Sequence, residues 1–400
     1  MRKLIAFARA VLRQIVSIAA TLLGLLALTF FIGRMLPIDP VISIIGEQAD
    51  HATYMMVYHQ LGLDRPLWQQ FYLFVRSMLS GDFGNALFTG NSVADDLARV
   101  FPATIELATF AICIGVGIGV PLGVLAAVFR GSIIDHVARF VGIMGYSSPT
   151  FWLGLMGLIL FYSVLGLVGG PGRMDVFYLD VVEPRTGLLL VDSLLSGEYE
   201  VFWNALSHIV LPGSILAFGS MAYISRMTRS FMLEQLGQEY VIAARVKGQS
   251  RWQVVRRHAF RNILVQLITV IALAYAFLLE GAVLTETVFA WPGFGRYLTS
   301  GLLAGDMNAV LACVLIVGTI FIGVNLLTDL LYRIWDPRTR CGPARSPPAA
   351  PGSPPRSPPR RARRTSSAHT TAGSACARIR WRCSALVFCS CCWCWPRSAP

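Results

Sequence analysis

The residue types that most often carry catalysis are few and widely spaced in this sequence of 400 residues. No H-E-x-x-H, G-x-S-x-G or phosphate-binding G-x-x-x-x-G-K-S/T pattern occurs in it. One functional class to consider is a membrane-embedded enzyme. Such an enzyme would need His, Asp, Glu or Ser side chains brought together at membrane depth. The six histidines are scattered instead over predicted loops and span ends: His51, His59, His136, His208, His258 and His369. We therefore expect no catalytic site, no cofactor site and no metal site in this chain.

The segment 238–248 has the residue pattern of a short docking helix. Residues from Glu239 to Lys247 predict a helix, and Gly248 suits a left-handed cap at its end. One face at spacing i, i+3, i+4 and i+7 carries an aromatic, two small and one basic residue, namely Tyr240, Ala243, Ala244 and Lys247. Small residues permit a close backbone approach, so the pattern favours insertion into a groove on a partner protein. A basic loop facing lipid is the simpler alternative. Nucleic-acid binding is disfavoured because the basic residues flank two spans and face anionic lipid.

Apart from its last 60 residues, the chain has the composition of a membrane protein. Apolar residues make up 55% of the sequence and charged residues 14%, whereas soluble domains carry roughly 25% charged residues. The last 60 residues hold ten arginines and no acid, which leaves 24 basic and 22 acidic residues in 1–340. Of the nine cysteines, Cys113 and Cys313 lie in that body, so neither disulfides nor zinc are needed to explain it.

Six apolar stretches are long enough to cross a hydrocarbon core of ~30 Å. We place the spans at 15–33, 103–129, 140–168, 206–225, 263–285 and 309–332. The first span follows the basic segment 1–14 and is too long for a signal-peptide core, so it is interpreted as an uncleaved anchor. The sequence thus predicts an all-α membrane protein of six transmembrane helices, with a larger outer domain at 34–102 after the first helix.

The charges of the loops predict their sides of the membrane, because cytoplasmic loops carry an excess of Lys and Arg. Three segments have more basic than acidic residues: 1–14, 130–139 and 226–262. Two have more acidic residues, 34–102 and 169–205, and belong outside. The two kinds alternate without conflict, so both termini are predicted to be cytoplasmic and the connection 286–308 to lie outside.

Three glycines in the second predicted span, Gly115, Gly119 and Gly123, recur at spacing four. This small-xxx-small pattern predicts close packing against another helix. Prolines are expected to break or kink the second, third and fourth spans at Pro121, Pro149 and Pro212.

The acids in the predicted spans do not indicate an ion-coupled carrier. Glu106 and Asp329 lie near span ends and Glu280 lies in the outer part of the fifth span, so none sits centrally with a basic partner. A proton- or sodium-coupled carrier usually needs such a group. With no ATP-binding loop either, the energy for transport must come from another subunit, or transport is passive.

The segment Tyr240-Val-Ile-Ala-Ala-Arg-Val-Lys-Gly248 resembles the EAA loop of importer permeases in the Y-V-x-T-A-R-A-K-G form of the dipeptide/oligopeptide/nickel type. The following His258-Ala-Phe-Arg-Asn262 resembles the H-A-L-R-N element of the same loop. In that family the loop forms a coupling helix that sits in a cleft of an ATP-binding-cassette (ABC) subunit. Carried over by position, the contact would involve Ala243, Ala244, Arg245, Lys247 and Gly248. The chain departs from the family where Ala243 replaces the common Thr and Val246 the usual Ala.

A second long segment supports the resemblance. Glu286-Thr-Val-Phe289-Ala-Trp291-Pro292-Gly293-Phe294-Gly295 resembles the E-T-V-F-x-W-P-G-x-G element that follows the fifth span in the family. Its proline and glycines favour a tight, outer re-entrant turn, for which we single out Glu286, Phe289, Pro292, Gly293 and Gly295. Trp335-Asp-Pro-Arg338 resembles the family's closing D-P-R, so the resemblance covers about residues 1–340.

The resemblance implies the fold of a type I ABC importer permease, the first ("B"-type) member of its pair, in the inner or plasma membrane. The partners it implies are a second homologous permease, two ABC ATPase subunits, an extracytoplasmic solute-binding protein and membrane lipid. ATP and magnesium would be bound by the ATPase subunits and not by this chain. Peptides are the first choice of solute, and nickel chelates or glutathione-like solutes are the alternative. The coupling-loop match disfavours a passive channel or a membrane receptor.

Residues 341–400 do not resemble the family. Their first part is rich in Pro, Arg, Ser and Ala, which predicts disorder. The composition changes abruptly just after Arg338, so our hypothesis is that this tail is out-of-frame translation of GC-rich DNA. Resequencing the locus tests it, since an intact frame with a transcript matching the tail would refute the idea.

Overall fold

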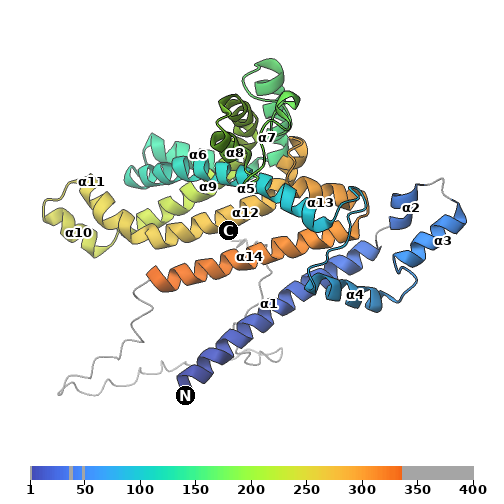
Figure 1. Cartoon of the computed structure of the whole chain (residues 1–400). Helices are drawn as coiled ribbons and strands as arrows, with labels where there is room; N and C mark the ends of the chain where they lie inside the picture. The colour runs from blue at the N-terminus through green and yellow to red at the C-terminus, as the bar shows by residue number, and fades with distance from the viewer. Residues whose placement is uncertain (1, 36–38, 47–49, 336–400) are drawn as a thin grey trace, which may run out of the picture. The chain divides into compact units, whose positions relative to one another are not determined.

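The computed structural model of the protein describes residues 2–35, 39–46 and 50–335, and these residues form helices joined by loops (Figure 1). The predicted tail at 341–400 lies outside the described residues. Within the described ranges, β pairing is limited to one isolated bridge between Asn85 and Ser92. The all-α class predicted from the sequence is therefore confirmed for this part of the chain.

The helices keep one series of labels along the chain. The first half contains α1 Arg2–Met35, α2 Pro40–Ile45, α3 His51–Gln60, α4 Leu67–Leu79, α5 Val93–Val128, α6 Ile133–Ser147, α7 Thr150–Gly157 and the π-helical turn η1 Leu158–Val164. The second half contains the short 3-10 turn η2 Val176–Tyr178, α8 Leu189–Ser196, α9 Tyr199–Leu236, α10 Glu239–Val246, α11 Arg251–Gln253, the π-helical turn η3 Val254–Ala259, α12 Phe260–Val288, α13 Phe294–Leu303 and α14 Met307–Trp335.

Five helical segments are long and apolar enough to cross a membrane. They are Leu12–Arg34, Val93–Val128, Tyr199–Leu236, Arg251–Val288 and Met307–Leu327. Most extend beyond the predicted spans. The longest, α9, has 38 residues and measures about 57 Å at 1.5 Å per residue, well over the ~30 Å of a hydrocarbon core. Such helices carry structure outside the membrane at both ends.

The predicted third span, 140–168, is broken into a bent pair of helices rather than continuous. Ile133–Ser147 and Thr150–Val164 meet at an angle of 97°. The break lies at Ser148, whose backbone is extended, because the ring of the following Pro149 disfavours a helical conformation there. By contrast, Pro121 and Pro212 lie inside the continuous helices α5 and α9.

The bent pair nevertheless joins the two ends of the helix bundle. We call the end that carries residues 237–259 the basic end, and the end that carries 169–198 and 289–306 the acidic end. At the start of the pair, Asp135 binds Arg229 near the basic end of α9. Just after its end, the Gly172 N–H donates to the Phe289 carbonyl at the acidic end of α12, at 2.8 Å. If the bent pair is counted as one broken span, the number of crossings rises from five to six.

The glycines of α5 lie against α9. A Cβ atom on Gly115 would lie 2.3 Å from Ser220 Oγ, and one on Gly123 would lie 2.5 Å from the Ser225 carbonyl oxygen. On Gly119 it would lie 3.0 Å from the Met221 carbonyl oxygen. The two backbones therefore come as close as the glycine spacing predicts.

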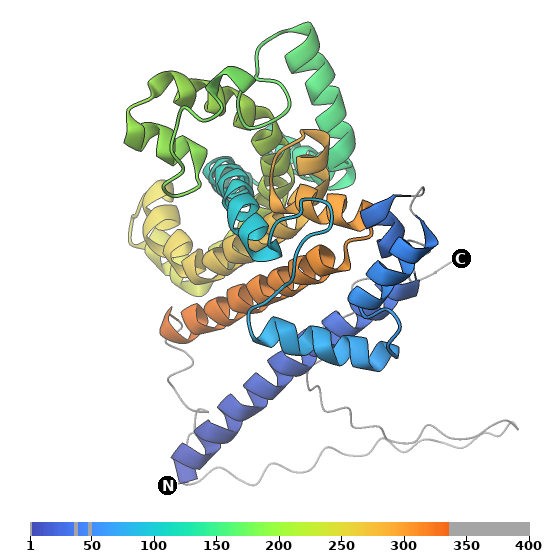
Figure 2. The same cartoon turned by 45° about the vertical axis from the view of Figure 1, so that its right-hand side comes forward.

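A buried apolar core joins α5, α9 and α12 along this contact. Its fully buried members include Leu107 of α5, Ile209 of α9 and Ala282 of α12. A second cluster packs α1 against α14, α4 and α13 through Phe30, Leu311 and others, and both views show α1 running beside α14 (Figure 1, Figure 2).

Two glycine-to-alanine variants in α5 test this packing. Gly123→Ala should destabilise the protein by about 1–3 kcal/mol, because the added methyl group overlaps the α9 backbone. Gly117→Ala is the matched control, since nothing lies within 4 Å of its Cβ position, and it should be neutral or stabilising by up to about 1 kcal/mol. Thermal unfolding of the purified protein measures both, and equal melting temperatures would contradict the assigned contact.

Candidate functional site

The predicted docking helix is present as α10, at the basic end. Gln238 precedes it with an extended backbone, and Glu239 places an acid in the first turn, which the helix dipole favours. After the last turn, Gly248 has a φ of 81°, and its N–H donates to the Arg245 carbonyl at 2.9 Å. This glycine conformation is the left-handed cap expected from the sequence.

The faces of α10 differ from the predicted arrangement. Val241 and Ala244 are buried and pack with Val254 and Leu236 of the same chain. Ala244 therefore packs against the rest of the chain and helps to position α10, so it does not share an exposed face with Tyr240. The Tyr240 hydroxyl donates to Gln235 Oε1 at 2.9 Å.

The exposed surface of α10 is apolar as well as basic. Val246 is 82% exposed and Ile242 57% exposed, and both lie one turn apart on the same side of the helix. Ala243, Arg245, Lys247 and Gly248 are exposed too. Neither Ile242 nor Val246 is among the residues predicted above to contact the ATPase subunit. Their apolar character within a basic loop is the sequence feature that could have indicated an exposed apolar surface.

The segment after α10 holds it against the end of α5. Ser250 and Gln253 form a capping box that begins α11. Arg251 donates to the Val128 carbonyl at the end of α5, and its guanidinium lies 4.8 Å from the ring centroid of Phe129. The position of α10 is thereby coupled to α5.

A buried carboxylate links α6 to α9 at the same end. Asp135 accepts from Arg229 Nε at 2.7 Å and Nη2 at 3.1 Å, a bidentate pairing that fixes both distance and orientation. The Gly131 N–H donates to the same carboxylate at 3.0 Å, and Arg139 Nε lies 3.7 Å from it. Asp135 thus joins α6 to α9 and to the loop that follows α5, and Arg229 lies ten residues before α10 begins at Glu239.

At the acidic end, Glu286 organises the turn between α12 and α13. Its fully buried carboxylate accepts from the Gly295 N–H at 2.6 Å and the Arg296 N–H at 3.1 Å, in the first turn of α13. It also accepts from the Thr104 hydroxyl of α5 at 2.6 Å. A carboxylate at a helix N-terminus is stabilised by the unpaired N–H groups and by the helix dipole.

The other residues singled out in the turn lie around this carboxylate. A Cβ atom on Gly293 would come within 2.5 Å of the Glu286 carboxylate, and one on Gly295 within 2.5 Å of the Val283 Cα. Phe289 is buried against α9, whereas Pro292 is exposed at the corner of the turn. The structure brings these residues together as one compact turn.

The turn is also bound to α5 and to the loop at 165–198. Trp291 Nε1 donates to the Ala103 carbonyl at 3.0 Å, and the guanidinium of Arg173 lies 5.9 Å from the Trp291 ring centroid. Arg173 in turn pairs with Glu106 of α5 at 2.5 Å. No local sequence pattern predicts this ion pair, because 67 residues separate its members.

Two further acids shape the loops of the acidic end. Burial raises the pKa of Asp192, but hydrogen bonds from Thr186 and the Gly187 N–H outweigh it, so the net pKa is lowered. Burial raises the pKa of Asp306, which accepts from the Leu87 and Ala309 N–H groups and so ties the loop before α5 to the start of α14. Among the described residues, no group of three or more His, Cys, Asp or Glu is placed to hold a metal ion. The side chain of Asp329 lies outside the described part.

A Glu286→Gln variant tests the role of this carboxylate. It removes a charged acceptor from two N–H groups, so it should cost about 1.5–3 kcal/mol and lower the melting temperature by several degrees. Glu183→Gln is the matched control, because Glu183 is exposed in the loop at the same end. If both variants have the melting temperature of the wild type, Glu286 does not hold the turn.

Comparisons with known proteins place this architecture in a family. The sequence profile described as "Binding-protein-dependent transport system inner membrane component" matches residues 119–340, and its N-terminal companion profile matches residues 7–108. A probable D,D-dipeptide transport system permease protein, DdpB of Escherichia coli K12, is 44% identical over 315 residues, which cover 79% of this chain and 92% of that protein.

Two dipeptide permeases have a similar sequence identity to this chain. The dipeptide transport system permease protein DppB of Escherichia coli K12 is 41% identical over 82% of this chain and 98% of its own length. The di/tripeptide transport system permease protein DppB of Pseudomonas aeruginosa is 41% identical over 82% of this chain and 97% of its own length. A solved structure of the MetNI methionine ABC transporter aligns with a TM-score of 0.44 and 20% identity, over 60% of this chain and 95% of that chain. On the profile matches and these identities, the chain belongs to the family of inner membrane components of binding-protein-dependent transport systems.

Proposed function

We propose that this chain is one permease subunit of an ATP-driven peptide importer. The three permeases described above are named as transport proteins for D,D-dipeptides, dipeptides and di/tripeptides. Each of these proteins matches the chain over more than nine-tenths of its own length. Peptides are therefore favoured over nickel chelates and glutathione-like solutes as the cargo.

The observation that carries the mechanism is the exposed side of α10. Ile242 and Val246 present apolar surface to the solvent at the basic end, next to Arg245 and Lys247. An apolar face with a basic rim, on a helix held rigidly from behind, has the form of a helix that enters a groove on a partner. We assign that groove to an ABC ATPase subunit, as the EAA-loop resemblance implies.

The energy for transport would then come from outside the chain. ATP and magnesium would be bound by two ATPase subunits, while this chain binds no cofactor. Closure of the ATPases would push α10, and through it the ends of α5 and α9. A second homologous permease would complete the pathway, and an extracytoplasmic binding protein would deliver the solute to the acidic end.

The direction of the chain across the membrane follows from its charges. Arg256, Arg257 and Arg261 are exposed where the fifth span begins, and arginines at such positions favour the cytoplasmic side. With the bent pair counted as a crossing, six crossings place both termini in the cytoplasm. The basic end then faces the ATPases and anionic lipid, and the acidic end faces outward.

A single charge on α10 tests the docking surface. Val246→Asp should lower ATP-dependent dipeptide uptake and co-purification of the ATPase subunits by about tenfold or more, because a charge is buried unpaired in the contact. The measurement uses the complete transporter in liposomes together with its binding protein. Membrane insertion of the variant should be unchanged.

Ile133→Asp is the matched control, because Ile133 is also 82% exposed and also lies at the basic end, on α6. It should retain ATPase binding and uptake. Wild-type uptake by Val246→Asp, or an equal loss in both variants, would contradict docking through α10.

A further inference from the structure

Glu280 is an acid on a spanning helix that the folded chain leaves unpaired. It lies on α12, eight residues before the helix ends at Val288, which is about 12 Å along the helix axis. Its side chain is exposed, and within the described part of the chain it has no hydrogen bond or ion pair. In contrast, Glu106 and Glu286 near the same end are buried and bonded.

The cost of a charge in lipid argues that Glu280 faces something else. Insertion scales put the cost of a charged side chain at about 2.5–3.5 kcal/mol at the centre of a spanning helix, and Glu280 lies toward the outer end of its helix. Acids within spans nevertheless normally face a bundle interior or a water-filled path. The second half of the bent pair gives a comparison within the same chain. Residues 140–172 contain no charged residue, and α7 and η1 expose large apolar side chains such as Trp152, Ile159 and Phe161.

The exposed stripe around Glu280 is mixed in character. Phe277 and Leu284 are each more than half exposed one turn before and after it, and Gly281 and Thr287 are exposed on the same side. The charged carboxylate distinguishes this stripe from residues 140–172, which expose the hydroxyls of Tyr162 and Ser163 but carry no charged group. A face of this kind suits a path through which a polar solute passes.

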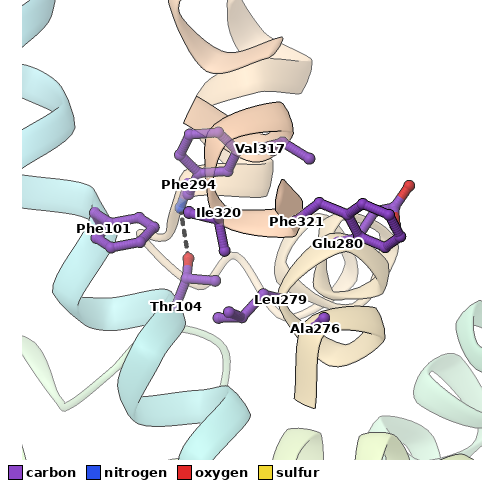
Figure 3. Close-up of a pocket in the computed structure, with 9 residues that line it drawn as sticks. All are labelled: Phe101, Thr104, Ala276, Leu279, Glu280, Phe294, Val317, Ile320 and Phe321. Carbon is purple, nitrogen blue, oxygen red and sulfur yellow. Dashed lines mark hydrogen bonds between the residues drawn. The ribbon is translucent and has the colours of Figure 1, made fainter. Parts of the chain in front are cut away.

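No neighbouring helix supplies a cation to Glu280. The carboxylate lies at the edge of a narrow crevice between α5, α12, α13 and α14, and it points outward (Figure 3). Apart from Glu280, the crevice is lined by apolar side chains and Thr104, including Phe101, Phe294 and Phe321, and by no Lys, Arg or His. Within the described part of the chain this carboxylate has no positive partner, so a group from outside it can pair with Glu280.

We propose that Glu280 lines the solute path and binds the α-ammonium group of the peptide during its passage. This inference rests on the proposed function, because a free α-ammonium is the positive group that unmodified di- and tripeptides share. Charge complementarity between the unpaired carboxylate and that ammonium selects this occupant. A basic side chain of the second permease is the competing occupant, and the test below separates the two.

A graded charge series at Glu280 tests the inference in the complete transporter, reconstituted in liposomes with its binding protein and dialanine. The variants are Glu280→Asp, Glu280→Gln and Glu280→Lys, and the control is Leu264→Gln, an exposed position at the other end of α12 and outside the stripe. Three quantities are measured: dialanine taken up per ATP hydrolysed, ATPase stimulation by the binding protein, and co-purification of the second permease.

We expect Glu280→Asp to stay within about twofold of wild type and Glu280→Gln to lower the uptake per ATP about tenfold, the scale of a hydrogen bond to a charged group. Glu280→Lys should lower it further. Assembly, ATPase stimulation and the control variant should stay at wild-type levels.

Three results would overturn the inference. Wild-type uptake by Glu280→Gln and Glu280→Lys would show that the carboxylate does not contact the solute. Loss of the second permease from the purified complex would assign Glu280 to a contact between subunits, and an equal loss of uptake in Leu264→Gln would assign the effect to α12 as a whole rather than to the carboxylate. Failure of the wild-type transporter to take up dialanine would instead refute the proposed function, and the inference with it.

Discussion

The close approach of α9 to the glycine face of α5 is the constraint on which the rest of the structure depends. Where a Cβ atom on Gly123 would lie 2.5 Å from the α9 backbone, the two helices cannot separate or rotate independently without losing a dry, well-packed contact. Both functional regions are attached to this pair. The end of α5 binds Arg251 behind α10, and α9 leads directly into α10. At the other end, Ala103 and Thr104 of α5 hold the turn that Glu286 organises.

This arrangement gives a physical route between the two ends of the molecule. A push on α10 reaches the ends of α5 and α9 through Arg251 and through the Asp135–Arg229 pair. Because α5 and α9 are packed along their length, the displacement is carried as a rigid-body movement rather than absorbed locally. At the acidic end α5 binds Arg173 through Glu106 and Trp291 through the Ala103 carbonyl. In the proposed function, such a connection would link the place where the ATPase subunits push to the place where solute enters.

Much of this could be predicted from the sequence where the signal is local. The helix at 239–246, its glycine cap and the compact turn from Glu286 to Gly295 each depend on neighbouring residue types, and the structure has all three. Features that depend on distant residues could not be predicted. Val254 decides which face of α10 is buried, so Ala244 points inward although its spacing fits the exposed set. Arg173 reaches Glu106 only through tertiary folding. The break of the third span at Pro149 was predicted, because it depends on the proline itself, but the angle of 97° between the two halves was not.

The central claim is that the exposed side of α10, and not its buried side, contacts the ATPase. Site-specific photo-crosslinking in the assembled transporter measures this most directly, with the crosslinking residue placed at Ile242 or Arg245 and, for comparison, at the exposed Leu303 of the acidic end. The account predicts crosslinks to the ATPase subunit from Ile242 and Arg245 and none from Leu303. Absence of ATPase crosslinks from both α10 positions, in a complex that hydrolyses ATP and imports solute, would contradict it.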